Sequence, residues 1–182
     1  VNQLVQKHRG LILPLCQRTF HESIVIDRAL TLSNHIFKTR LHTDREISNN
    51  EAYERALRYV MSELAILEWL VKVSPVRVSW ASQDRADTSA FDLIALGGYN
   101  LFEPVMDFAF IDVKLCEKDS STITVTRDEH YALTRNPHIY HLTCDRRENE
   151  LVITNFYRAK DQRWKTCRDS SSFIGKNEII QL

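Results

Sequence analysis

The sequence predicts an α/β (α+β) domain in which a central mixed β-sheet is flanked by helices and preceded by an N-terminal helical segment. Three observations support this fold class. Two helical apolar stripes come first, short apolar or alternating runs typical of strands follow, and one further helix interrupts those strands. With 182 residues, 43% of them hydrophobic, the chain is long enough to bury a core.

The two longest helical patterns lie in the first half of the chain. A capping-box pattern at 19–22 precedes the first apolar stripe, and a second capping pattern at 48–51 precedes the next one. We expect the second helix to end before the Ser-Pro pair at 74–75, because proline disfavours helical geometry in the residue before it.

After residue 75 the pattern changes to that of strands. One helix is expected among them, from a capping pattern at 126–129 to about residue 135. The polar turn DRRENE joins the last two strands. Strands are expected at 76–82, 91–96, 107–115, 123–126, 138–144 and 150–157.

We therefore expect an N-terminal helical appendage over 1–47, a core over 48–157 and a basic C-terminal segment over 158–182 packed on that core. Lys plus Arg and Asp plus Glu number 24 each, which argues against binding through overall charge but permits a local basic groove. The four cysteines form no CxxC pair, and no apolar run is long enough to span a membrane. These features predict a soluble, cytoplasmic protein with no membrane partner.

Three charged residues interrupt the apolar strands: Asp92 in FDLIAL, and Asp112 and Lys114 in DFAFIDVKL. Buried strands exclude ionised groups unless the groups are paired or hold a metal. Because side chains alternate along a strand, Asp112 and Lys114 share one face, about 6–7 Å apart. Asp92 joins them if its strand is the neighbour. The alternative is that these charges pair with one another on a solvated face.

Two carboxylates suit a hard cation such as Mg²⁺, and a nearby lysine can orient or help deprotonate an attacking water and stabilise transition-state charge. The arrangement resembles the PD-(D/E)xK nuclease superfamily, which has the restriction-endonuclease-like fold. The motif matches as Phe91-Asp92 followed by Asp112-Val113-Lys114. Phe91 replaces the usual proline, and Asp112 fills a position where Glu is also common.

The resemblance covers about 50–157 and implies a site with Mg²⁺ (or Mn²⁺) held by Asp92 and Asp112. The family also commonly places a metal-site Glu on the preceding helix. Glu63 is the candidate, because its helical neighbours are apolar, whereas Glu68 lies nearer the edge of the stripe and close to a lysine. The alternative for Glu63 is a partly buried acid paired with Arg or Lys. Glu129 is expected to cap its helix.

A basic segment follows the last predicted strand. It offers cations that can contact phosphate groups and a tryptophan that can stack on a base. The alternative is a solvated surface element with one buried Trp. The candidate nucleic-acid-binding residues are Arg158, Lys160, Arg163, Trp164 and Lys165.

His138, His141 and Cys144 have a spacing that is also found among zinc ligands. In a strand, three-residue steps point to opposite faces, so these side chains are not expected to converge on one ion. We therefore do not expect zinc at these positions.

The leading hypothesis is a divalent-metal-dependent endonuclease that hydrolyses phosphodiester bonds in DNA, of restriction or mobile-element type. The first alternative is an endoribonuclease of the same fold, and the second is a noncatalytic interaction subunit that retains the fold. The expected partners are nucleic acid and either a second copy, as a homodimer, or a partner nuclease or subunit, because cutting two strands usually needs two active sites.

Overall fold

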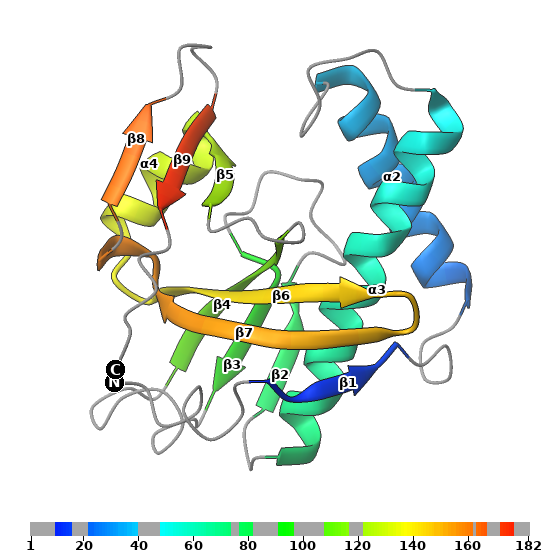
Figure 1. Ribbon diagram of the computed structural model, residues 1–182, viewed down its shortest axis with the longest axis horizontal. Helices are drawn as coiled ribbons and strands as arrows, with labels where there is room; N and C mark the ends of the chain where they lie inside the picture. The colour runs from blue at the N-terminus through cyan, green and yellow to red at the C-terminus, as the bar shows by residue number, and fades with distance from the viewer. Residues whose placement is uncertain are drawn as a thin grey trace.

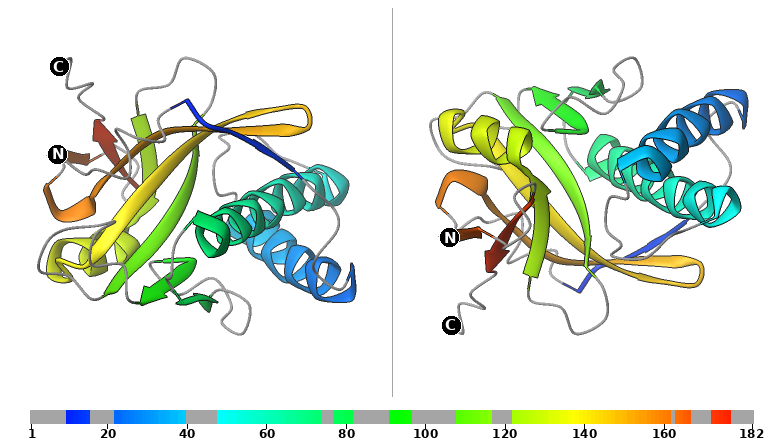
Figure 2. Two further views of the ribbon diagram at one scale, coloured as in Figure 1. Left: turned by 90° about the horizontal axis from the view of Figure 1, so that it is seen from below. Right: turned by 90° about the horizontal axis from the view of Figure 1, so that it is seen from above.

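The computed structural model confirms a mixed α/β fold with a curled six-stranded sheet (Figures 1 and 2). Its strand order is β1-β7-β6-β4-β3-β2, and a second sheet has the order β5-β9-β8. The structure describes residues 10–15, 22–39, 48–73, 77–81, 91–96, 108–116, 122–161, 163–166 and 172–176.

The helices and strands follow one another in the order helix-helix-strands-helix-strands that the sequence predicts, apart from one additional strand at the start and two in the C-terminal segment. The helices are α2 (Glu22–Thr39), α3 (Asn49–Val73), α4 (Arg127–Arg135) and the short 3₁₀ helix η2 (Ala159–Asp161). The strands are β1 (Ile12–Pro14), β2 (Arg77–Trp80), β3 (Leu93–Leu96), β4 (Phe108–Cys116), β5 (Thr122–Thr126), β6 (Ile139–Arg147), β7 (Glu150–Arg158), β8 (Arg163–Thr166) and β9 (Ser172–Lys176).

Neighbouring strands of the six-stranded sheet are antiparallel, except that β4 and β6 run parallel. Parallel strands need a crossover connection. Here the chain passes through β5 and α4 between them. Figure 2 shows α2 and α3 on one side of the sheet and α4 on the other. The strand that carries Asp112 and Lys114 is therefore central in the sheet, between β3 and β6.

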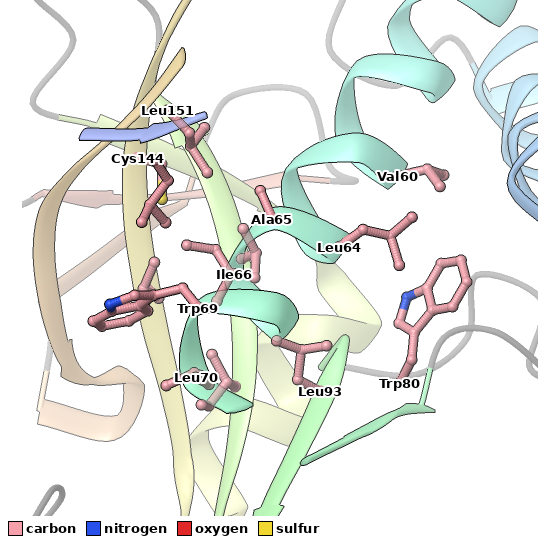
Figure 3. Close-up of a cluster of buried hydrophobic side chains, with 14 of the residues drawn as sticks. Val60, Leu64, Ala65, Ile66, Trp69, Leu70, Trp80, Leu93, Cys144 and Leu151 are labelled. Carbon is pink, nitrogen blue, oxygen red and sulfur yellow. The ribbon is translucent and has the colours of Figure 1, made fainter. Parts of the chain in front are cut away.

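Helix α3 begins and ends where the sequence predicts. The Ser48 hydroxyl oxygen accepts a hydrogen bond from the backbone N–H of Glu51 (3.1 Å), which satisfies one of the free donors of the first turn. The helix ends at Val73, ahead of the Ser-Pro pair. Figure 3 shows its apolar side chains, among them Ile66 and Leu70, packed against residues of the sheet. Helix α2 packs on α3, and the expected cap at 19 lies outside the described residues.

Two features of the six-stranded sheet differ from the sequence-based expectations. Strand β1 was not predicted, and it pairs with β7 at the edge of the sheet, so the first 47 residues contribute a strand as well as a helix (Figure 1). The turn between β6 and β7 is only residues 148–149, because Arg146 and Arg147 continue the ladder opposite Leu151 and Glu150. A polar strand end at the sheet margin has the composition of a turn, which is why the sequence suggested a longer one.

The C-terminal basic segment forms η2, β8 and β9, and the last two strands complete the sheet with β5. The expected strand at 123–126 is thus confirmed, but it belongs to this smaller sheet. Within the described part of the chain, no helix is both long and apolar enough to cross a membrane.

Candidate functional site

Asp112 and Lys114 project from the same face of β4, as strand alternation predicts. The Nζ atom of Lys114 lies 3.0 Å from Oδ2 of Asp112. Asp112 is 4% exposed, so its carboxylate lies inside the protein instead of on a solvated face. A buried charge needs a partner of opposite sign or a metal, and Lys114 supplies the first.

Asp92 lies directly before β3, and β3 is the antiparallel neighbour of β4. Its backbone N–H donates to the carbonyl of Ile111 (2.9 Å), and its Oδ2 accepts from the backbone N–H of Val113 (2.8 Å). The adjacency on which the sequence argument depended is therefore present. Asp92 meets the backbone of β4 between Asp112 and Lys114.

Glu63 reaches the same region from α3. It is buried, and its Oε2 accepts a hydrogen bond from the indole N–H of Trp80 (2.7 Å). Trp80 pairs with Leu93 at the start of β3, next to Asp92. The other candidate on this helix, Glu68, instead forms an exposed ion pair with Lys72. We call Glu63, Asp92, Asp112 and Lys114 the acid–lysine site.

The charges in the acid–lysine site shift one another's pKa values. Burial raises the pKa of Asp92 well above its ordinary value, and the nearby charges of Glu63 and Asp112 raise it further, although Lys114 opposes them. Such crowding of carboxylates favours either protonation or a bound cation.

Asp112 behaves differently because Lys114 and His141 lie beside it. Burial acts to raise its pKa, but Lys114 and His141 outweigh burial and lower the pKa to about 2. For Lys114, burial acts to lower the pKa, but Asp112, Glu129 and Asp92 together raise it well above its ordinary value. The lysine is therefore an ammonium ion at neutral pH.

Two residues that the sequence argument did not place here also contact the site. Oε1 of Glu129, on the first turn of α4, lies 3.1 Å from Nζ of Lys114, so this acid pairs with the lysine. His141 on β6 is fully buried, and its Nε2 lies 3.2 Å from Oδ2 of Asp112. Glu129 follows Lys114 by one strand and the first turn of a helix, and this position is the only sequence feature that could have indicated the contact. For His141 there was none, because the parallel register of β4 and β6 is a long-range property.

The basic segment is described in part. Arg158 lies over the Tyr140 ring (5.9 Å from guanidinium carbon to ring centre) and 3.8 Å from Asp161, while Lys160 is exposed. The backbone of Arg163, Trp164 and Lys165 forms β8, and their side chains lie outside the described part of the structure.

The donor set of the acid–lysine site suits a hard divalent cation. Within the described ranges, no three His, Cys, Asp or Glu side chains are grouped closely enough to form a complete metal site. Mg²⁺ does not need such a cage, because it keeps several waters and commonly binds through one or two carboxylates together with substrate phosphates. Asp92 and Asp112 are the carboxylates that could hold such an ion, and burial together with the charges of Glu63 and Asp112 raises the pKa of Asp92.

No family model, curated protein or solved structure matches the chain. A function can therefore be inferred only from the chemistry of the acid–lysine site.

Proposed function

We propose that this protein is a divalent-metal-dependent endonuclease that hydrolyses phosphodiester bonds in DNA. The observation that supports the proposal is the convergence of Asp92, Asp112 and Lys114 at the β3–β4 pair, with Glu63 behind them. The antiparallel β3–β4 pair, the parallel β6 and the helix α3 that carries Glu63 also support the restriction-endonuclease-like core that we propose for this chain.

In this proposal Asp92 and Asp112 would hold the cation, and Glu63 would complete the metal site or orient water. A bound Mg²⁺ supplies Lewis-acid stabilisation of phosphate charge and a water of lowered pKa. Because its pKa is raised, Lys114 carries its proton in the metal-free protein. In the proposed reaction its ammonium group donates to phosphate oxygens as negative charge develops and positions the attacking water.

The basic C-terminal segment is the proposed contact with the nucleic-acid backbone, through Arg158, Lys160, Arg163 and Lys165, with Trp164 stacking on a base. Neutralising phosphates with lysine and arginine makes binding depend on salt concentration. We also propose a cytoplasmic location, to which the free thiols of Cys116 and Cys144 are suited.

The decisive experiment compares cleavage of plasmid, single-stranded DNA and RNA with Mn²⁺ or Mg²⁺. We expect Asp112→Ala and Lys114→Ala to abolish cleavage while circular dichroism shows a retained fold. Glu68→Ala is the matched control, since it removes an acid from α3 that pairs with an exposed lysine. Metal-dependent cleavage that persists in both site variants would rule out the assignment.

The same experiment separates the alternatives. Cleavage of RNA alone would identify an endoribonuclease that uses the same site. A calorimetric titration with Mn²⁺ that shows no binding would instead favour a noncatalytic interaction subunit.

We further propose that the protein acts as a homodimer, because cutting both DNA strands usually needs two active sites. Helix α2 supports this through three large apolar side chains on its outer surface: Ile26, Leu30 and Phe37 are 44%, 48% and 45% exposed. Exposed apolar residues gathered on one element are typical of contact surfaces.

A further inference from the structure

His141 occupies a position at which an apolar residue would be the ordinary choice. It is the third residue of β6, directly opposite Asp112 in the parallel β4–β6 register, and is fully buried. Its Nε2 lies 3.2 Å from Oδ2 of Asp112. Its Nδ1 lies 3.3 Å from the hydroxyl oxygen of Tyr157 on β7, and the two rings meet edge to face with centres 5.4 Å apart.

The chemistry of Asp112, His141 and Tyr157 favours one tautomer of His141. A neutral imidazole has one nitrogen that donates and one that accepts. The ionised carboxylate of Asp112 can only accept, so the tautomer with its hydrogen on Nε2 is the one that suits the 3.2 Å contact with Asp112 Oδ2. In that tautomer Nδ1 is an acceptor, to which the Tyr157 hydroxyl can donate.

Asp112 Oδ2 is therefore approached from two directions, by His141 Nε2 at 3.2 Å and by Lys114 Nζ at 3.0 Å. Two such contacts on one oxygen restrict rotation of the carboxylate and so fix the direction of its other oxygen. Carboxylates that bind metals are commonly held in this way by neighbouring groups, and removing those groups weakens metal binding.

We propose that His141, held in turn by Tyr157, is a positioning residue that orients the Asp112 carboxylate for a divalent cation. This inference depends on the metal site of the proposed function, and it adds the residues that preorganise that site. His141 and Tyr157 act through Asp112 and touch neither metal nor substrate, so their removal lowers metal affinity more than the rate of the loaded enzyme.

The test measures Mn²⁺ binding by calorimetry and cleavage as a function of Mn²⁺ concentration. We expect His141→Leu to weaken Mn²⁺ binding by about 10–100-fold, with the cleavage rate at saturating Mn²⁺ retained. His141→Gln, which keeps a donor toward Asp112, should recover part of that affinity. Tyr157→Phe removes a single oxygen atom and should weaken binding by a smaller factor than His141→Leu.

Thr154→Val is the matched control. It breaks the partly buried hydrogen bonds between Thr154 and Thr143 (2.8 and 2.9 Å) in the same β6–β7 hairpin, two residues along β6 from His141. We expect it to lower stability and leave Mn²⁺ affinity unchanged, which separates a positioning role from a general packing role.

The outcomes distinguish this inference from the proposed function. A wild-type protein that binds no Mn²⁺ would overturn both. A wild-type protein that binds Mn²⁺, with unchanged affinity in Tyr157→Phe, would overturn the His141–Tyr157 inference alone. Tyr157→Phe also decides the matter if His141→Leu does not fold.

Discussion

Asp92 and Asp112 are neighbouring carboxylates whose pKa values shift in opposite directions. Asp112 has Lys114 and His141 beside it, whereas burial and two other acids dominate the surroundings of Asp92. Pairs of acids whose surroundings shift their pKa values in opposite directions are typical of functional sites. At Asp92 the carboxylate is kept at a cost to the stability of the metal-free protein.

That cost predicts a stabilising substitution. A carboxyl group whose pKa is higher in the folded chain binds more protons when folded, so stability falls as the pH rises above its unfolded pKa of about 4. In EDTA at pH 7, Asp92→Asn should therefore have a larger free energy of unfolding than wild type, and the difference should shrink toward pH 4. Urea denaturation at both pH values measures it.

Asp27→Asn, at an exposed position of α2, is the control and should show no such advantage. Equal or lower stability of Asp92→Asn at pH 7 would show that the Asp92 carboxylate is not destabilising.

Strand alternation was sufficient to predict from the sequence that Asp112 and Lys114 share a face, because it is a local property. The contact of Asp92 with β4 required knowing that β3 is its neighbour. His141 could not be placed at all, since its position beside Asp112 depends on the register of two strands joined by a long crossover.

Among the helices and strands, those with strong local signals were predictable. Helix α3 has a cap, an apolar stripe and a terminating proline, and its observed bounds follow them. Strand β1 has only three residues and no alternation, and its partner β7 lies at the other end of the chain. For β5 the sequence predicted a strand but not the sheet to which the strand belongs. That depends on its pairing with β9 near the end of the chain.

The cap of α3 gives a prediction for this element. Ser48→Ala removes the acceptor for the Glu51 N–H and should lower the free energy of unfolding by about 1 kcal/mol. Ser48→Asn keeps a capping oxygen and should be close to wild type. Urea denaturation of the three proteins is the measurement, and equal stability of Ser48→Ala and wild type would show that the cap contributes nothing.

For the whole molecule, the proposed metal binding would be linked to folding. A cation that binds only the folded chain stabilises it, by about 2.7 kcal/mol at a concentration one hundred times its Kd. For a chain of this length we expect Mn²⁺ to raise the melting temperature by about 5–10 °C. Differential scanning calorimetry with and without EDTA measures this shift.

Asp112→Ala should show no comparable shift on addition of Mn²⁺. An equal shift in this variant would place the ion elsewhere on the molecule.

The proposed dimer is also a property of the whole molecule. Leu30→Glu puts a charge at the centre of the exposed apolar side chains of α2 and should convert a dimer into a monomer, because burying an unpaired charge is costly. Light scattering after size exclusion measures the mass. Asp27→Asn, on the same helix, should leave the mass unchanged, and a wild-type monomer would contradict the proposal.

The pairing of β5 with β9 has a consequence for the order in which the chain becomes structured. A nascent chain emerges from the ribosome beginning with its N-terminus, so β5 and α4 are exposed well before residues 172–176, which form β9. The smaller sheet cannot close until then. Since Glu129 lies on α4, which packs on β5, we expect its contact with Lys114 to be secured only late in synthesis.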